Sequence, residues 1–167
     1  MQKKVLSEQA LIYGDVAMPV GWDIDRNKLS DDILQSKIQN KKFPFSKTWD
    51  ILNTYVRDHV GLEHQINLVN KDFFGHIYKP GEISQPFINV DPVDLRNSPD
   101  FTLLYGVKVK SCMVRIYYDD NRRKGRSWDI NLEDNKFILF PSTCLYYLIN
   151  DQKNSLNFVH TILYEYV

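Results

Sequence analysis

The stretch that decides the fold is Lys136-Phe-Ile-Leu-Phe-Pro-Ser-Thr-Cys-Leu-Tyr-Tyr-Leu-Ile-Asn150. Its apolar run 137–140 predicts a buried strand, and the second apolar run 146–149 predicts another. Between the two runs, Pro141 has no amide hydrogen to donate, so the hydrogen-bond ladder of the first strand should end there. The stretch therefore predicts two strands joined by a short turn, with Phe140 buried beside the turn.

Most of the remaining chain shows the same pattern of short apolar segments separated by turn residues, about ten residues apart. Further strands are expected at 10–18, 64–69, 73–78, 87–90, 102–109, 113–118, 127–132 and 157–167. This spacing is typical of a jelly roll built from antiparallel strands.

Two helices are expected before most of these strands. One covers 29–38, and its apolar stripe is Leu29, Ile33, Leu34 and Ile38. The other covers 47–60, with Ser46 as N-cap and Gly61 as its stop. We therefore expect one mainly β (α+β) domain over 1–167. Its helical part should span about 27–61 and its β part about 64–167, with both helices packed on one sheet.

Composition narrows the class of protein. The chain has 167 residues, with 21 basic and 21 acidic side chains, so no net field steers it toward nucleic acid or an anionic membrane. The sequence offers no apolar run long enough for a signal peptide or a membrane span, which favours a cytoplasmic protein. Cys112 and Cys144 have no metal-ligand spacing and are expected to be free, buried thiols.

Several phrases carry a family resemblance. The segments 74–82, 104–109 and 140–142 resemble the double-stranded β-helix of the 2-oxoglutarate and Fe(II) oxygenases. The chain as a whole resembles a protein family of tailed phages of marine cyanobacteria, through the phrases at 91–95, 118–129 and 140–143. The first resemblance implies a jelly roll, and the second implies action in the cytoplasm of an infected host.

The oxygenase resemblance also implies a ligand set, and this sequence departs from it. The family binds iron through a His-x-Asp or His-x-His pair and a distal histidine, whereas here these places fall on Phe87 with Asn89 or on Asn89 with Asp91, and on Tyr146 or Tyr147. No histidine occurs between His76 and His160, and no Lys or Arg follows Lys153 to pair with the far carboxylate of 2-oxoglutarate. We therefore expect no metal, no cofactor and no catalytic residue.

Two alternatives stay open. An active oxygenase or cupin-like enzyme with Fe(II) and 2-oxoglutarate would need a non-standard site, for which His76, Asp91 and His160 are the candidates. Without such a site, the protein would act by binding a protein partner or a small ligand. The side chains expected to line a ligand cavity are Asn89, Asp91, Tyr117, Trp128, Tyr146 and Tyr147, although aromatic residues in such strands are more often core.

One basic segment suggests a third function. Arg122, Arg123, Lys124 and Arg126 lie between two expected strands and could hold nucleic-acid phosphates. Asp119, Asp120 and Asp129 lie close by in the sequence and would neutralise much of that charge. This balance favours a solvated turn or a contact with a protein partner, such as a second copy in a homodimer, over nucleic acid.

Overall fold

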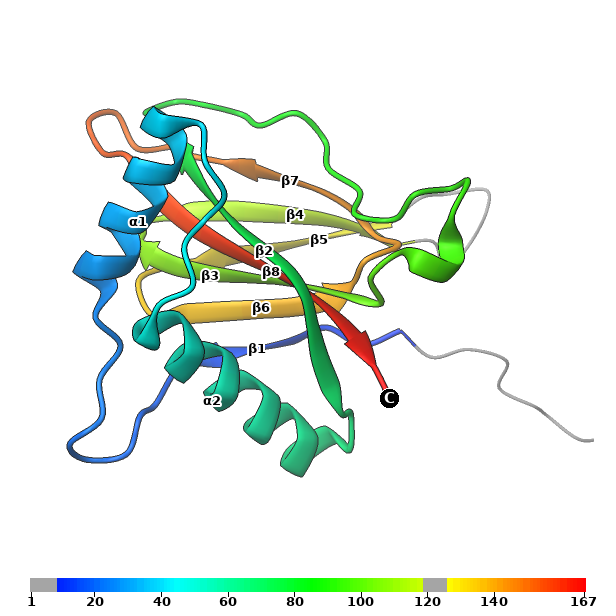
Figure 1. The fold of residues 1–167 in the computed structure, drawn as a ribbon. Helices are drawn as coiled ribbons and strands as arrows, with labels where there is room; N and C mark the ends of the chain where they lie inside the picture. The colour runs from blue at the N-terminus through cyan, green and yellow to red at the C-terminus, as the bar shows by residue number, and fades with distance from the viewer. Residues whose placement is uncertain (1–8, 119–125) are drawn as a thin grey trace, which may run out of the picture.

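Two antiparallel sheets face each other, and both helices cover the outer face of the larger sheet (Figure 1). The structure is a computed structural model that describes residues 9–118 and 126–167. The larger sheet has the strand order β1-β6-β3-β8-β2, and the smaller sheet has the order β5-β4-β7. The strands are β1 (Ile12–Asp15), β2 (Leu68–Tyr78), β3 (Phe101–Lys108), β4 (Cys112–Tyr118), β5 (Arg126–Leu132), β6 (Lys136–Pro141), β7 (Leu145–Ile149) and β8 (Asn157–Tyr166). The predicted jelly roll with two helices on one sheet is confirmed.

Both helices are longer than the sequence predicts. Helix α1 spans Arg26–Gln39, and helix α2 spans Lys47–His64. Ser46 is the N-cap of α2, as predicted, because its hydroxyl accepts a hydrogen bond from the Trp49 amide at 3.2 Å. The predicted stop at Gly61 is wrong, since the helix continues to His64 and ends where Gln65 adopts a left-handed conformation with φ of 57°.

The strand predictions need two corrections. The expected strands 64–69 and 73–78 are one continuous strand, β2, whose register shifts between Asn70 and Asp72. A bulge of this kind keeps a long strand paired across an irregular residue. The expected strand 87–90 is absent from the described part of the chain, where residues 83–87 make only isolated bridges to β7 through Ile83 and Phe87.

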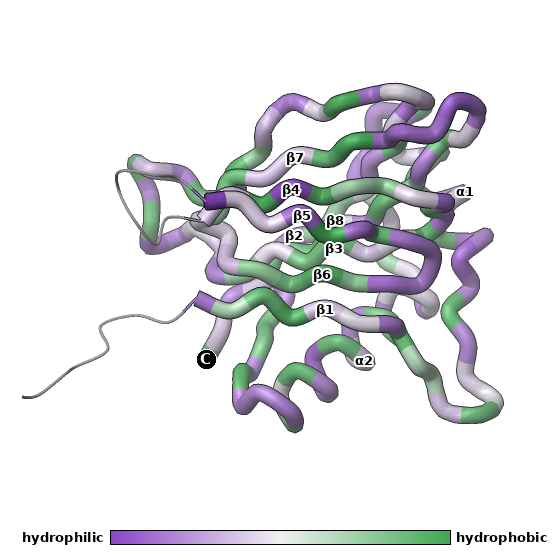
Figure 2. Tube along the Cα trace, turned by 180° about the vertical axis from the view of Figure 1, so that it is seen from behind, coloured by the Kyte–Doolittle hydropathy of each residue, from purple (hydrophilic) through white to green (hydrophobic). Residues whose placement is uncertain are grey.

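A first core fills the space between the sheets. Along β4 the inward side chains Cys112, Val114 and Ile116 are buried and alternate with the outward residues Met113 and Arg115. The other buried residues of this core are Tyr78, Leu104, Val109, Leu132, Ile138, Phe140, Cys144, Tyr146, Leu148 and Val159. Figure 2 shows the same concentration of apolar residues along the central strands.

A second core lies between the larger sheet and the helices. Leu29 and Ile33 of α1 and Leu52, Val56 and Val60 of α2 are buried there. The expected α1 stripe is correct for its first half only, because Leu34 and Ile38 are exposed to solvent. Neither helix within residues 9–118 and 126–167 combines the length and apolar content that a membrane span requires.

Candidate functional site

The sheets bring two distant stretches of sequence together at one corner of the inter-sheet core. Phe87 lies beside Tyr146 of β7, and the two residues exchange both backbone hydrogen bonds, at 2.7 and 3.0 Å. The turn after Phe140 positions Tyr146, because Cys144 donates its amide to the Pro141 carbonyl at 3.0 Å and so reverses the chain. These are the two stretches on which the oxygenase resemblance places the iron ligands.

Four neutral polar side chains form a hydrogen-bonded network at this corner. The Asn89 amide nitrogen donates to the Thr102 hydroxyl at 2.9 Å and to the Tyr146 hydroxyl at 3.2 Å. The Thr102 hydroxyl in turn lies 2.9 Å from the Ser142 hydroxyl. Thr102, Ser142 and Tyr146 are all buried. The network thus satisfies polar atoms that burial would otherwise leave unpaired.

Aromatic rings surround this network. The ring of Tyr146 lies 5.5 Å from that of Phe87 and 5.0 Å from that of Phe140, with centroids as the reference points. Burial raises the pKa of Tyr146 to about 12, and the hydrogen bond from Asn89 offsets only part of this effect. Tyr146 is therefore a neutral phenol at physiological pH and not an anionic ligand.

The donor set at the corner does not fit Fe(II). A non-haem iron site of the oxygenase type combines two imidazoles with one carboxylate. The corner offers a carboxamide, a phenol and two hydroxyls, and Asn89 directs its N–H hydrogens, not its lone pairs, at the hydroxyls. Within residues 9–118 and 126–167, no cluster of three or more His, Cys, Asp or Glu side chains has the geometry to hold a metal ion.

The alternative iron ligands His76, Asp91 and His160 are not brought together. Gly75 pairs with His160, and His76 pairs with Val159, so the two histidines project from opposite faces of the larger sheet. His160 contacts Phe43 on the helix side, whereas His76 contacts Phe87 on the inner side. Asp91 is exposed, and its carboxylate accepts a hydrogen bond from the Val93 amide in a surface turn. This trio cannot share one ion.

The remaining cavity candidates are divided between the two faces of the smaller sheet. Tyr117 and Tyr147 lie on its outer face, with ring centroids 6.0 Å apart, and do not line an internal cavity. They share that face with Arg115, which forms an ion pair with Asp129. Trp128 is paired with the buried Ile116 and therefore lies on the inner face.

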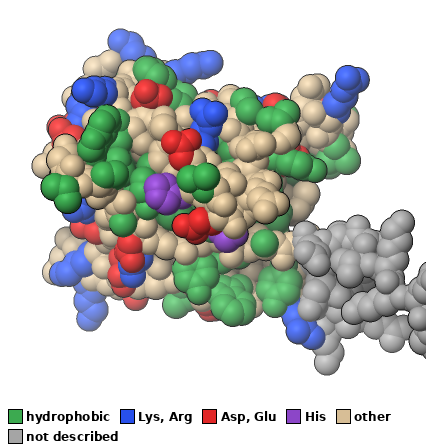
Figure 3. Space-filling model, turned by 90° about the horizontal axis from the view of Figure 1, so that it is seen from below, with side chains coloured by type: hydrophobic (Ala, Val, Ile, Leu, Met, Phe, Trp, Pro, Cys, Tyr) green, Lys and Arg blue, Asp and Glu red, His purple; other side chains and the backbone are tan. Residues whose placement is uncertain are grey.

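The basic segment falls mostly outside the described residues. Arg122, Arg123 and Lys124 belong to the undescribed stretch, and the prediction about them stays a prediction. Arg126 is the first residue of β5 and pairs with Tyr118. On the face seen in Figure 3, acidic and basic side chains are interspersed, which does not favour a polyanion there.

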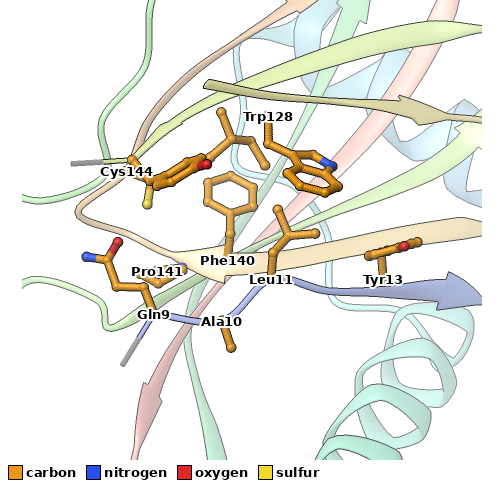
Figure 4. A pocket seen from close by; sticks show the side chains of 10 residues that line it. Gln9, Ala10, Leu11, Tyr13, Trp128, Phe140, Pro141 and Cys144 are labelled. Atoms are coloured by element: carbon orange, nitrogen blue, oxygen red, sulfur yellow. The ribbon is translucent and has the colours of Figure 1, made fainter. Parts of the chain in front are cut away.

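A hollow opens between the two sheets at the edges formed by β1 and β5. Its volume is about 350 Å³. Figure 4 shows Phe140 projecting from β6 beside Leu11, on the segment that leads into β1, and Trp128, on β5. The described residues that line it are Gln9, Ala10, Leu11, Tyr13, Ile116, Tyr118, Trp128, Phe140, Pro141 and Cys144. Phe140 therefore connects the hollow with the polar corner, since its ring also contacts Tyr146.

Comparisons with known proteins identify the fold. No family model and no curated protein sequence matches the chain. Among solved structures, a prolyl-4-hydroxylase from Pseudomonas putida superposes with a TM-score of 0.64 at 11% sequence identity, covering 94% of this chain and 88% of that one. The viral collagen prolyl hydroxylase of Paramecium bursaria Chlorella virus-1, solved as a 2OG complex, gives a TM-score of 0.64 at 14% identity, with coverages of 94% and 96%.

A third structure agrees with these two. The epimerase SnoN from nogalamycin biosynthesis, described as non-heme and alpha ketoglutarate dependent, gives a TM-score of 0.63 at 6% identity and covers 93% of this chain and 77% of SnoN. The chain has the fold of the 2-oxoglutarate and Fe(II) oxygenases. At these identities the likeness concerns the fold alone.

Of the residues expected to line a ligand cavity, Asn89 and Tyr146 meet at the corner, and Trp128 lines the hollow. Asp91, Tyr117 and Tyr147 lie elsewhere. The hollow depends on Leu11 and Tyr13 lying opposite Trp128, and nothing in the local sequence shows that the N-terminal strand pairs with β6. The alternation of β4 is a further signal, because it places Ile116 and Tyr118 on the inner face.

Proposed function

We propose that this oxygenase-shaped protein does not carry out Fe(II) and 2-oxoglutarate chemistry and acts by binding, as an accessory protein. The observation that supports this proposal most directly is the Asn89–Tyr146 hydrogen bond at the corner where the resemblance places the iron ligands. A buried, neutral and internally satisfied network offers a divalent cation no negative charge to offset the loss of its hydration shell.

The site for the co-substrate is also incomplete. The resemblance requires a basic residue in the last strand, yet β8 reads Asn-Phe-Val-His-Thr-Ile-Leu-Tyr-Glu-Tyr and has no Lys or Arg. Asn157, a buried polar side chain at its start, is already engaged, since it donates to the Ser111 carbonyl and accepts from the Lys110 amide. A dicarboxylate would find no cation on this strand to balance its charge.

The binding role then falls to the surfaces that remain, which are the apolar hollow and the outer face of the smaller sheet. The partner is a small ligand or another protein. From the resemblance of its sequence phrases, we assign this role to a phage of marine cyanobacteria or a related marine organism, with action in the host cytoplasm.

The test replaces the corner residues by the missing ligands. Tyr146→His, alone and together with Asn89→Asp, is assayed for iron-dependent conversion of 2-oxoglutarate, next to the unmodified protein. Tyr147→His is the matched control, because Tyr147 lies on the outer face of the same strand. We expect no turnover in any of the four proteins. Iron-dependent turnover by the unmodified chain or by Tyr146→His alone would show that the other ligands are already present, and would establish the enzyme alternative.

A further inference from the structure

The hollow between the β1 and β5 edges has the size and composition of a small-molecule site. Its volume of about 350 Å³ lies at the lower end of the range for ligand pockets, roughly 300 to 1,000 Å³. Three separate parts of the chain contribute walls: the segment before and within β1, the strands β4 and β5, and the end of β6 with its turn.

Among residues 9–118 and 126–167, no charged side chain lines the hollow. Its polar groups are the Gln9 amide, the Tyr13 and Tyr118 hydroxyls, the Trp128 indole N–H and the Cys144 thiol, and all of these can form hydrogen bonds with a neutral ligand. Moving an ionised ligand from water into such a wall would leave its charge uncompensated. The chemistry of the wall therefore selects a neutral ligand.

Aromatic rings set the shape of the hollow. Phe140 is fully buried and forms the floor, while Trp128 keeps 54% of its surface exposed although it lies on the inner face of its sheet. An indole turned inward but not covered presents a flat face on which another ring can stack. Figure 4 shows the Trp128 ring beside Phe140 and next to Leu11.

Tyr13 lies at one end of the hollow, next to charged side chains. This residue also lines a second hollow of about 220 Å³ farther along the same seam, where Asp15 and Lys136 contribute to the wall. The two hollows share Tyr13, so the seam changes from apolar to ionic at that ring. Among the described residues that line the first hollow, a ligand body thus meets no charged side chain.

We propose that this hollow is a binding site for a neutral, flat, polycyclic aromatic compound that stacks on Trp128 above Phe140. This inference rests on the proposed function in one respect, which is that the protein acts by binding and not by catalysis. It concerns a different set of atoms from the Asn89–Tyr146 corner, so the result of an iron assay does not decide it.

The experiment uses the full chain and the neutral fluorescent probe N-phenyl-1-naphthylamine, titrated while its emission is recorded. The anionic probe 1-anilinonaphthalene-8-sulfonate, which has similar rings, serves as the charge control. We expect saturable binding of the neutral probe at one site and at least tenfold weaker binding of the anionic probe. No saturable binding of the neutral probe, or equal or tighter binding of the anionic one, would overturn the proposal.

A pair of tryptophan variants locates the site. Trp128→Ala should weaken binding of the neutral probe by roughly tenfold or more, since the stacking surface is lost. Trp22→Ala is the matched control, because Trp22 is similarly exposed, at 60%, but does not line the hollow. It should change the affinity less than twofold. Equal effects of the two substitutions would contradict the assignment.

A second measurement needs no variant. Cys144 lines the hollow and is 5% exposed, whereas Cys112 is fully buried in the core between the sheets and serves as the internal reference. Burial raises the pKa of both thiols, so alkylation by N-ethylmaleimide should be slow. Saturating neutral probe should slow the modification of Cys144 severalfold and leave that of Cys112 unchanged, as read by peptide mass spectrometry. An unchanged rate at Cys144 would refute the site.

Discussion

Replacing Phe140 by Ala tests whether the turn after β6 anchors the core between the sheets. The Phe140 side chain has no solvent exposure, and its ring meets that of Tyr146 edge to face, with centroids 5.0 Å apart and an interplanar angle of 69°. Truncating a buried Phe to Ala costs about 3 to 5 kcal/mol, of which an aromatic pair contributes about 0.5 to 1.5 kcal/mol. Because one side of Phe140 faces the hollow, the cavity that the truncation leaves joins an existing one. We therefore expect the substitution to lower the free energy of unfolding by about 3 to 4 kcal/mol.

Urea unfolding followed by circular dichroism measures this loss. The midpoint concentration should fall while the dependence of the unfolding free energy on urea stays the same. The loss would be a large part of a typical domain stability of about 5 to 15 kcal/mol. Phe45→Ala is the control, since Phe45 is 67% exposed and should cost less than about 1 kcal/mol. A cost below about 1 kcal/mol for Phe140→Ala would refute the packing described for this corner.

Three further predictions concern other parts of the fold. Burial lowers the pKa of His160 to about 3, so the folded state favours the neutral ring. The contribution of this ring to stability should be present above about pH 6.5 and should decline by up to about 1.4 kcal/mol per pH unit below that pH. His160→Leu should lessen this pH dependence in urea titrations at pH 7 and 5. A Cβ added at Gly75 would lie 2.4 Å from a carbon of Ile33, so Gly75→Ala should displace α1 and lower the melting temperature by several degrees in calorimetry. Arg115→Ala removes a partly exposed ion pair with Asp129 and should shift the free energy of unfolding by only about 0 to 1 kcal/mol; a larger change would mean that this face is covered in solution.

The parts of the fold that sequence predicts well are those in which local chemistry decides the outcome. Ser46 caps α2 because its hydroxyl reaches an amide three residues away, and this interaction needs no partner from elsewhere in the chain. The alternation along β4 follows from backbone geometry, so the inward positions Val114 and Ile116 can be inferred from the sequence. Pro141 ends β6 because it has no amide hydrogen to donate.

The predictions that failed depend on distant contacts. Gly61 does not end α2, since packing of Val60 against the larger sheet keeps the helix in place and Gln65 supplies the left-handed residue. Ile38 belongs to the apolar pattern of α1 but lies beyond the area that the sheet covers, so it remains exposed. The meeting of Asn89 with Tyr146, which are 57 residues apart, is set by the pairing of two strand segments and could only be guessed from the resemblance.

The most direct test of the central claim is a calorimetric titration of the purified full chain with Fe(II) under anaerobic conditions, with and without 2-oxoglutarate. Because the corner of Asn89, Thr102, Ser142 and Tyr146 is neutral and internally hydrogen bonded, we predict no saturable binding of the metal at micromolar protein. The co-substrate should not change this result. Binding of about one equivalent of Fe(II), tightened by 2-oxoglutarate, would contradict the account and establish an oxygenase with a non-standard site.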